Sequence, residues 1–359
     1  MTSGSPASRV FFGAASIGAG HGGLARLSRL TARTLASMTV DVAVLSLLDE
    51  VDSDLPVSYR ASSRGRKLDF LVRCHAAALT RTHFLFDTVN VARAHPKSPF
   101  PRRPYGLWMA GVEIWEGLNP ARRATLDGAD LVIAISKFTL DHFEEMHGTR
   151  PPASVCWLGT EDDDASPVSM NFSGVPTALI VGRLDLEECN SKGQEELIRV
   201  WPAVVAVVPK ARLLIVGGGS ALSHVRALAA GSTVSANIEV VGFVPEREMA
   251  AVWGQAHVFA MPSRNEGFGL VYVEAMRHGL PVVASTHDAG QEVNVHGETG
   301  FNVCLDNDDE LAGCLVQLLS DLELCKQMGE RGRERWRTYF RFSAFRDRLA
   351  PILKGFLGT

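Results

Sequence analysis

The sequence predicts an α/β protein with two doubly wound domains. Short apolar runs alternate with helix-length segments along all 359 residues, and this order of elements produces parallel sheets with helices on both faces. Most of the runs are continuously apolar, as is typical of strands that are covered on both faces of a sheet. There are about twelve runs, whereas one doubly wound sheet has roughly five to seven strands. Two domains therefore fit the chain better than one.

The expected elements follow one another along the whole chain. The expected strands of the N-terminal half are residues 9–16, 40–48, 83–91, 105–112, 129–136 and 154–160. The expected strands of the C-terminal half are residues 177–183, 211–219, 237–244, 257–262, 280–285 and 300–304. The clearest helical segments are residues 23–37, 193–208, 269–278, 308–330 and an Arg-rich terminal segment, 328–356.

Residues 161–176, EDDDASPVSMNFSGVP, form the least patterned stretch near the middle of the chain. The stretch combines Pro, Ser, Gly and an acidic run without periodicity, which predicts a linker between the domains. Ligands of open parallel sheets bind beyond the carboxyl ends of the strands. We therefore expect the chemistry in the loops that follow the strands, and the main site in a cleft between the two domains.

The composition is that of an ordinary globular protein. Hydrophobic residues make up 46% of the chain and charged residues 21%, which excludes a disordered chain, collagen or a small disulfide scaffold. No apolar run approaches the roughly 18 residues of a membrane span, and the N-terminus lacks the pattern of a secretory signal, so we expect a cytoplasmic protein. The six cysteines include no C-x-x-C. Reduced thiols are therefore expected, with no metal site.

Positive charge is concentrated in the first 150 residues, which hold 18 Lys and Arg against 14 Asp and Glu, although the whole chain has a net charge of −4. Two interpretations of this charge remain open: a solvated helix face, or peripheral contact with an anionic partner such as the inner face of a membrane. The pI near 6.3 argues against a nucleic-acid partner. The basic cluster consists of Arg60, Arg64, Arg66, Lys67 and Arg73.

The strongest functional signal is SRNEGFGLVYVEAMRHG, residues 263–279. A loop with Glu266, Gly267, Phe268 and Gly269 follows an expected strand, and a helix opens at Leu270. The free N–H groups and positive dipole of a helix N-terminus suit a phosphate, and glycine lets the backbone approach a ligand closely. Glu266 and Glu274 stand eight residues apart, so they can reach different parts of one extended ligand. Ordinary surface carboxylates are the alternative interpretation.

The second signal is ALIVGRLDLEECNSKG, residues 178–193. Arg183 projects from the end of a strand, and Lys192 follows across a polar loop. Two cations beside one strand end are suited to a diphosphate, and charge-assisted hydrogen bonds contribute roughly 1.5–3 kcal/mol each. The alternative is an Arg that pairs with Asp185, Glu187 or Glu188.

Together these segments resemble the retaining nucleotide-sugar glycosyltransferases of family 4. The resemblance rests on G-R-L…K-G, LLIVGGG, GFVP, E-G-F-G-L-x-x-x-E-A-M and HDAGQEVNVHGETGF in the second half, and on GHGGLARLSRL, GVEIW and ADLVIAISKFT in the first. It covers nearly the whole chain, and the E-x7-E spacing is its most specific part.

The resemblance implies the GT-B fold, in which two Rossmann-like doubly wound domains face an interdomain cleft. On this basis residues 1–165 form an N-terminal acceptor-side domain and residues 166–336 form the domain that binds the nucleotide sugar. Residues 337–359 form a last helix that packs back on the N-terminal domain.

The family's site roles carry over to matching positions. Arg183 and Lys192 match the pair that neutralises the donor diphosphate, and the family's shorter Arg–Lys spacing makes Lys192 the weaker match. Glu274 matches the ribose-binding carboxylate, and Glu266 matches the one that contacts the transferred sugar. The remaining donor positions are Gly22 and Gly23 near the diphosphate, Val244 near the nucleobase, and Gly267, Phe268, Gly269 and Leu270 along sugar and phosphate.

One position departs from the family pattern. The family often has His-Gly-x-Glu after its fourth strand, whereas this chain reads Ala110-Gly111-Val112-Glu113. Alanine cannot donate a hydrogen bond or hold a charge. Either the subgroup works without that His or the residue was altered to slow turnover, and His21 in the glycine loop is a candidate substitute.

Two other patterns mimic different chemistry. Gly18-x-Gly20-x-x-Gly23 matches a dinucleotide fingerprint, and Asp49 or Glu50 would then be the ribose ligand, but the C-terminal motifs have no role in an NAD-dependent oxidoreductase. The acidic stretches 162–164 and 306–308 mimic a D-x-D metal motif and are interpreted as solvated turns.

The sequence thus predicts a retaining, metal-independent hexosyltransferase. A UDP-sugar or GDP-sugar is its expected donor, with no cofactor, and the acceptor is a hydroxyl of a glycan, glycolipid or small molecule. The alternatives are a catalytically impaired GT-B protein that binds a sugar nucleotide, a GT-B phosphorylase and the oxidoreductase.

Overall fold

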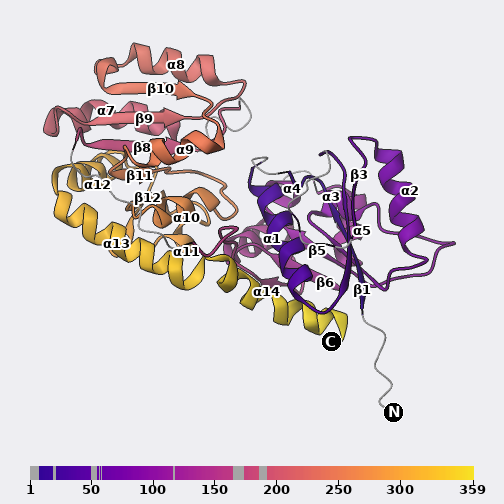
Figure 1. The fold of residues 1–359 in the computed structure, drawn as a ribbon. Coiled ribbons are helices and arrows are strands. Elements are labelled where there is room, and N and C mark those ends of the chain that lie inside the picture. Colours follow the sequence, from indigo (N-terminus) through magenta and orange to yellow (C-terminus); the bar gives the residue numbers. More distant parts are fainter. Residues whose placement is uncertain are drawn as a thin grey trace. The chain divides into compact units, whose positions relative to one another are not determined.

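The computed structural model describes residues 8–18, 22–49, 55, 57, 59–115, 118–164, 174–185 and 192–359. The chain folds as two compact units, and each has helices on both faces of a parallel sheet (Figure 1). Unit 1 comprises Met1–Asp162 and Arg341–Thr359, and unit 2 comprises Asp163–Phe340. None of the helices within the described residues is long and apolar enough to cross a membrane.

The described part of unit 1 contains a seven-stranded parallel sheet in the order β3-β2-β1-β4-β5-β6-β7. Its strands are β1 (Arg9–Ala14), β2 (Asp41–Ser46), β3 (Tyr59–Ser62), β4 (His83–Phe86), β5 (Tyr105–Met109), β6 (Leu131–Ala134) and β7 (Ser154–Val155). Its helices are α1 (Gly23–Ser37), α2 (Lys67–Ala77), α3 (Val89–Ala92), α4 (Val112–Trp115), α5 (Pro120–Asp127), α6 (Lys137–His147) and α14 (Phe342–Leu357).

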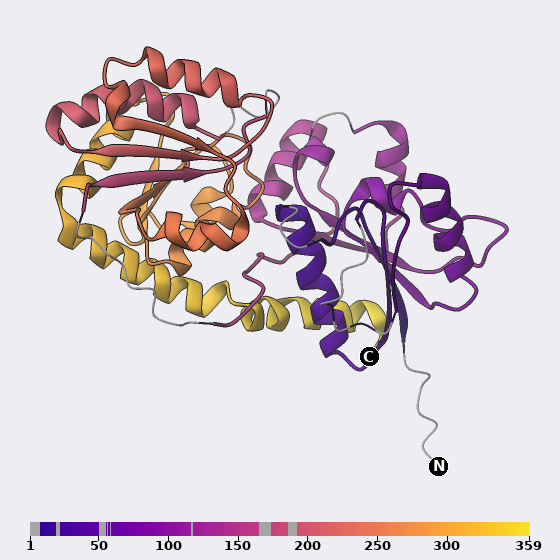
Figure 2. The ribbon, with the colours of Figure 1, turned by 45° about the horizontal axis from the view of Figure 1, so that its top comes forward.

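The C-terminal helix α14 belongs to unit 1, where it packs across α1 (Figure 2). Its apolar stripe has a helical spacing, with Phe345, Leu349 and Leu353 all buried, so burial of this face is what holds the helix in place. The Phe345 ring stacks on Trp108 of β5 with 6.3 Å between the ring centroids. The last turns of the chain are therefore part of the core of the first unit.

The described part of unit 2 contains a six-stranded parallel sheet in the order β10-β9-β8-β11-β12-β13. Its strands are β8 (Thr177–Val181), β9 (Arg212–Val216), β10 (Ile238–Gly242), β11 (Val258–Ala260), β12 (Val282–Ser285) and β13 (Gly300–Val303). Its helices are α7 (Gln194–Val207), α8 (Leu222–Gly231), α9 (Met249–Trp253), α10 (Leu270–Arg277), α11 (Gly290–Val293), α12 (Asp308–Ser320) and α13 (Leu322–Tyr339).

Both sheets reverse their strand order at one point. The reversal lies between β1 and β4 in unit 1 and between β8 and β11 in unit 2. At such a switch point the connections leave the two neighbouring strands in opposite directions, which opens a crevice beyond their carboxyl ends. The loops after these four strands are therefore the places where each unit is built to bind a ligand.

Two predictions of elements were wrong. Strand β3 was not predicted, because an edge strand with the sequence YRAS carries no apolar run. Residues 308–330 and 328–356 were each predicted as one helical segment, but the chain breaks at Asp321, whose carboxylate accepts the Leu324 N–H at 3.0 Å and caps α13. A second break separates α13, which ends at Tyr339, from α14.

Two helical glycines of unit 2 give a matched test of this packing. A Cβ on Gly329 of α13 would lie 1.9 Å from the carbonyl oxygen of Gly279, whereas a Cβ on Gly313 of α12 would meet nothing within 4 Å. We expect Gly329→Ala to lower the free energy of unfolding by about 1–3 kcal/mol and Gly313→Ala to raise it by up to about 1 kcal/mol. Urea unfolding of both variants measures this, and equal effects of the two substitutions would contradict the packing of α13.

Candidate functional site

Arg183 lies just beyond β8, on one side of the switch point of unit 2. Its side chain is 70% exposed, and Nη1 lies 3.6 Å from Oδ2 of Asp185. The structure thus shows the pairing with Asp185, while Glu187 and Glu188 lie outside the described residues. An exposed ion pair of this length contributes little free energy, so a stronger anion can compete for the guanidinium.

Lys192 lies between the end of β8 and the start of α7, and it joins the two sides of the switch point. Its Nζ is 2.6 Å from Oε2 of Glu266, in the loop after β11, and the two side chains are 21% and 19% exposed. The structure therefore brings together two of the predicted site residues that are 74 positions apart in the sequence. A partly buried charge pair at a strand switch point is typical of a ligand-binding centre.

Gly193 explains how this contact forms. Its φ is +92°, and a Cβ at this position would lie 2.4 Å from the carbonyl oxygen of Pro262, directly after β11. Only glycine allows both the left-handed backbone and this approach. The start of α7 therefore packs directly on the end of β11, and Lys192 is held beside Glu266.

A buried polar network fixes the backbone of the loop that carries Glu266. The carboxylate of Asp288, which is fully buried, accepts the Ser263 hydroxyl, the Gly290 N–H at 2.8 Å and the Glu266 N–H at 3.2 Å. The Tyr272 hydroxyl donates to the Met261 carbonyl at 2.7 Å. Burial raises the pKa of Asp288 to about 7. The network positions Glu266 through its backbone, and its carboxylate contacts Lys192.

The predicted glycine segment forms the turn that opens α10 (Leu270–Arg277). Gly269 has φ +85° and caps α10, and a Cβ there would lie 2.2 Å from the Tyr272 ring. The helix opens at Leu270, and Glu274 is half-buried in its second turn. The Phe268 side chain is 2% exposed and packs on Phe340 at 6.1 Å. Phe268 can therefore contribute only its backbone to a site.

Val244 follows β10, at the edge of the same sheet, and is partly exposed. The preceding Phe243 is 76% exposed. A Cβ on Gly218, after β9, would lie 3.0 Å from Cβ of Phe243. This part of the sheet edge thus presents one exposed aromatic ring beside a glycine loop. In the strand order, β9 separates β10 from β8, the strand that precedes Lys192.

Gly22 and Gly23 belong to unit 1, where both are exposed and Gly22 caps α1 with φ +87°. His21 and Gly20 lie outside the described residues. Asp49, the candidate ribose ligand of an oxidoreductase, is 5% exposed, and its carboxylate accepts the Gly18 N–H at 3.0 Å. Asp49 is therefore occupied in bracing the glycine loop and is a poor ribose ligand, while Glu50, the other candidate, lies outside the described residues.

Ala110 also belongs to unit 1, directly after β5, and it is half-buried. Its N–H donates to Oε1 of Glu113 at 3.0 Å. Burial raises the pKa of Glu113. The turn that would present a histidine at position 110 is therefore held by Glu113 even though the histidine itself is absent.

The acidic stretches that mimic a metal motif differ in their surroundings. Asp308 is bound by Arg199 through two contacts of 2.8 Å, and Asp306 is bound by Arg264 at 2.9 Å. The residues at 162–164 are exposed. The two carboxylates of the second stretch therefore bind different arginines.

Sequence reasoning did not identify three polar residues around the Lys192–Glu266 pair. Ser263 and Asp288 form the network described above. Gln194 is fully buried at the start of α7, and neither of its amide atoms has a hydrogen-bond partner among the described residues. In the sequence, only the positions of these residues could have pointed to them, because each follows a strand or a glycine at this edge of the sheet.

Comparisons with known proteins identify the family. Residues 175–321 match the family model described as glycosyl transferases group 1. The GDP-mannose-dependent alpha-(1-6)-phosphatidylinositol monomannoside mannosyltransferase of Mycobacterium tuberculosis is 31% identical over 263 residues, which are 68% of each chain. The phosphatidyl-myo-inositol mannosyltransferase of Mycobacterium leprae is 36% identical over 328 residues, covering 86% of this chain and 83% of the relative.

Solved structures support the same fold. The sucrose-phosphate synthase of Thermosynechococcus elongatus superposes with a TM-score of 0.77 at 20% identity and covers 98% of this chain and 99% of its own. Anabaena HepE in complex with UDP and glucose superposes with a TM-score of 0.75 at 20% identity, over 97% and 100% of the two chains. The chain is therefore a GT-B glycosyltransferase that uses a nucleotide sugar, and it belongs to the group 1 glycosyl transferases, of the family 4 type.

Proposed function

We propose that this enzyme transfers mannose from GDP-mannose to a hydroxyl of a glycolipid, with retention of anomeric configuration and without a metal ion. The observation that carries the proposal is the Lys192–Glu266 contact of 2.6 Å at the strand switch point. The relatives named for GDP-mannose and phosphatidylinositol-linked acceptors supply the donor and the acceptor class.

Charge complementarity determines how these residues would act. Lys192 and Arg183 stabilise the departing diphosphate, together with the N–H groups at the start of α10, and Glu266 contacts hydroxyls of the transferred sugar while Glu274 holds the ribose. Fixed cations and dipoles stabilise a developing charge without reorganisation, so no metal is required and no cofactor takes part.

The transfer step needs no protein nucleophile. The bond between the anomeric carbon and the diphosphate oxygen breaks, and the bonding electrons leave with the diphosphate. The acceptor oxygen forms its bond on the same face of the oxocarbenium-like sugar, and its proton passes to the departing phosphate oxygen. Retention follows from this geometry, and NMR of the newly formed anomeric proton tests it.

The surface of α2 supports a lipid acceptor presented at a membrane. Leu68, Leu71 and Val72 lie on one face of the helix at i, i+3 and i+4, and they are 78%, 38% and 66% exposed. Leu79, which is 66% exposed, continues the stripe. An apolar face beside basic residues is typical of helices that lie at a membrane interface.

Basic residues adjoin this stripe, and a cavity lies between α2 and the sheet. Arg64, Arg66 and Lys67 are exposed at the start of α2. A cavity of about 300 Å³ is lined by residues of β1, β2 and α2, with Arg73 and Arg81 among them. We therefore favour peripheral contact with an anionic membrane over a merely solvated helix face.

Vesicle binding tests this surface. Because each basic residue near an anionic surface contributes about 1 kcal/mol, Arg66→Glu with Lys67→Glu should weaken sedimentation with phosphatidylglycerol vesicles by more than tenfold, and Leu68→Gln with Val72→Gln should weaken it as well. Val207→Gln, which changes an equally exposed side chain on α7, is the control. Binding that is insensitive to both pairs of substitutions and to salt would contradict membrane contact through α2.

The transfer reaction itself is tested with radiolabelled donors. Purified enzyme is incubated in EDTA with GDP-mannose or UDP-glucose and with mannosylated phosphatidylinositol lipids in detergent micelles. We expect a labelled lipid product from GDP-mannose alone. A product formed only from UDP-glucose, or only on a water-soluble acceptor, would overturn the donor or the acceptor assignment separately.

Ala110 favours one second candidate, a catalytically impaired protein that binds the nucleotide sugar without transferring it. Such a protein would bind GDP-mannose and release neither mannose nor a mannosylated product over long incubations. Detection of free mannose, even from slow hydrolysis of the donor, would exclude that candidate.

A further inference from the structure

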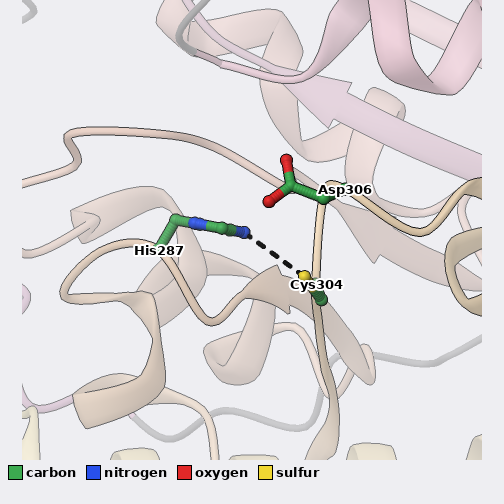
Figure 3. Close-up of side chains that lie close together, drawn as sticks. All are labelled: His287, Cys304 and Asp306. Carbon is green, nitrogen blue, oxygen red and sulfur yellow. Dashed lines mark hydrogen bonds between the residues drawn. The ribbon is translucent and has the colours of Figure 1, made fainter.

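Three side chains with metal-ligating atoms converge at the end of the unit 2 sheet, outside the site described above. His287 follows β12, and Cys304 and Asp306 follow the neighbouring strand β13 (Figure 3). One ligand atom from each residue lies within 4.8 Å of the other two. The first and last of the three are 19 positions apart in the sequence, so their convergence follows from the pairing of β12 with β13.

The distances suit a small tetrahedral ion. Nε2 of His287 lies 3.7 Å from Sγ of Cys304, and the imidazole points toward the thiol (Figure 3). In a tetrahedral zinc site the nitrogen and sulfur ligands lie about 3.6 Å apart, given the usual Zn–N and Zn–S bond lengths. The Asp306 side chain is 72% exposed, so its carboxylate can rotate the remaining distance without a change in the backbone.

The hydrogen bonds of His287 show which ring nitrogen carries the lone pair that metal binding requires. Nε2 of His287 accepts the Leu305 N–H at 3.2 Å, so this nitrogen is unprotonated in the neutral ring, and its one lone pair is engaged by that N–H beside the Cys304 thiol. Metal ligation by histidine requires this form of the ring. A metal ion would replace the thiol proton of Cys304 and displace the Leu305 N–H from the lone pair of Nε2.

The mixed ligand set points to one class of ion. A thiolate and an imidazole together favour zinc over magnesium or calcium, which prefer oxygen ligands alone. Binding would also take the Asp306 carboxylate from Arg264, its present partner at 2.9 Å. We propose that His287, Cys304 and Asp306 form a Zn²⁺ site with one open coordination position, separate from the diphosphate site. The ion takes no part in sugar transfer and links the ends of β12 and β13.

Cobalt(II) is the probe for this site, because a Co²⁺–thiolate bond gives an intense near-ultraviolet charge-transfer absorption. We expect the full-length enzyme, reduced and freed of metal, to develop this absorption with one equivalent of Co²⁺ and to lose it when Zn²⁺ is added. Zn²⁺ should also raise the melting temperature, because an ion that binds only the folded state stabilises it.

Variants assign the ligands. Cys304→Ser should abolish the charge-transfer band, and Asp306→Asn, at an exposed position that does not threaten folding, should weaken Co²⁺ binding at least tenfold. Cys314→Ser changes another partly buried thiol, on α12, and should leave the band unchanged. The proposal is overturned if no thiolate band forms in the unmodified enzyme, if the band survives Cys304→Ser, or if Asp306→Asn binds Co²⁺ as tightly as the parent.

Discussion

Lys192→Ala is expected to lower the turnover of mannosyl transfer by about 100-fold to 1,000-fold, which is the usual effect of removing one preorganised group that stabilises developing negative charge. Lys192 is 21% exposed and contacts Glu266 at 2.6 Å. The substitution therefore removes a cation from the leaving group and also leaves the Glu266 carboxylate to repel the diphosphate. Initial rates at saturating GDP-mannose measure the loss.

Two controls accompany this substitution. Lys210→Ala removes an exposed lysine of the same unit and should leave turnover unchanged, and EDTA should change neither enzyme. A loss of less than threefold in Lys192→Ala would show that the leaving group is stabilised elsewhere. Restoration of activity by a divalent metal would show that an ion supplies the missing charge.

Ala110→His is expected to raise turnover by about tenfold to 100-fold, equivalent to roughly 1.4–3 kcal/mol in the activation free energy. The turn that would carry the imidazole is present, because Ala110 follows β5 and its N–H is held by Glu113 at 3.0 Å. A hydrogen bond made mainly in the transition state raises turnover more than donor affinity. Turnover and the dissociation constant of GDP-mannose should therefore respond differently.

Ala110→Leu is the matched control, because leucine adds bulk without a hydrogen-bonding group. If both substitutions lower turnover equally while the protein stays folded, the native site is built around alanine. The absence of the imidazole would then be a property of this subgroup, and a group of the acceptor would be the better candidate for its role.

The architecture could be predicted from the sequence wherever burial determines the pattern of apolar residues. The central strands, such as β1 and β9, are continuous apolar runs because helices cover both faces of their sheets. Strand β3 escaped prediction because an edge strand needs no apolar run. The break at Asp321 was not predicted because the apolar positions of α12 and α13 continue across it. Only the capping aspartate marks the boundary between the two helices.

The individual residues of the site could be predicted from the sequence, but their arrangement in space could not. Arg183, Lys192 and Glu266 each follow a strand, which is visible in the sequence. Their contacts depend on the strand order, and the close approach of Gly193 to Pro262 could not be read from spacing. The same limit applies to His287 and Cys304, which meet only through the pairing of β12 with β13.

Calorimetric titration with GDP in EDTA tests the central claim most directly, because it measures the diphosphate site without an acceptor or a membrane. We predict that the enzyme binds GDP with one site per chain, that Lys192→Ala and Arg183→Ala each weaken binding at least tenfold, and that Ala110→Leu binds GDP as the parent does. If no GDP binds, or if it binds equally to the parent and to both cation variants, the assignment of the donor diphosphate to the ends of β8 and β11 is wrong.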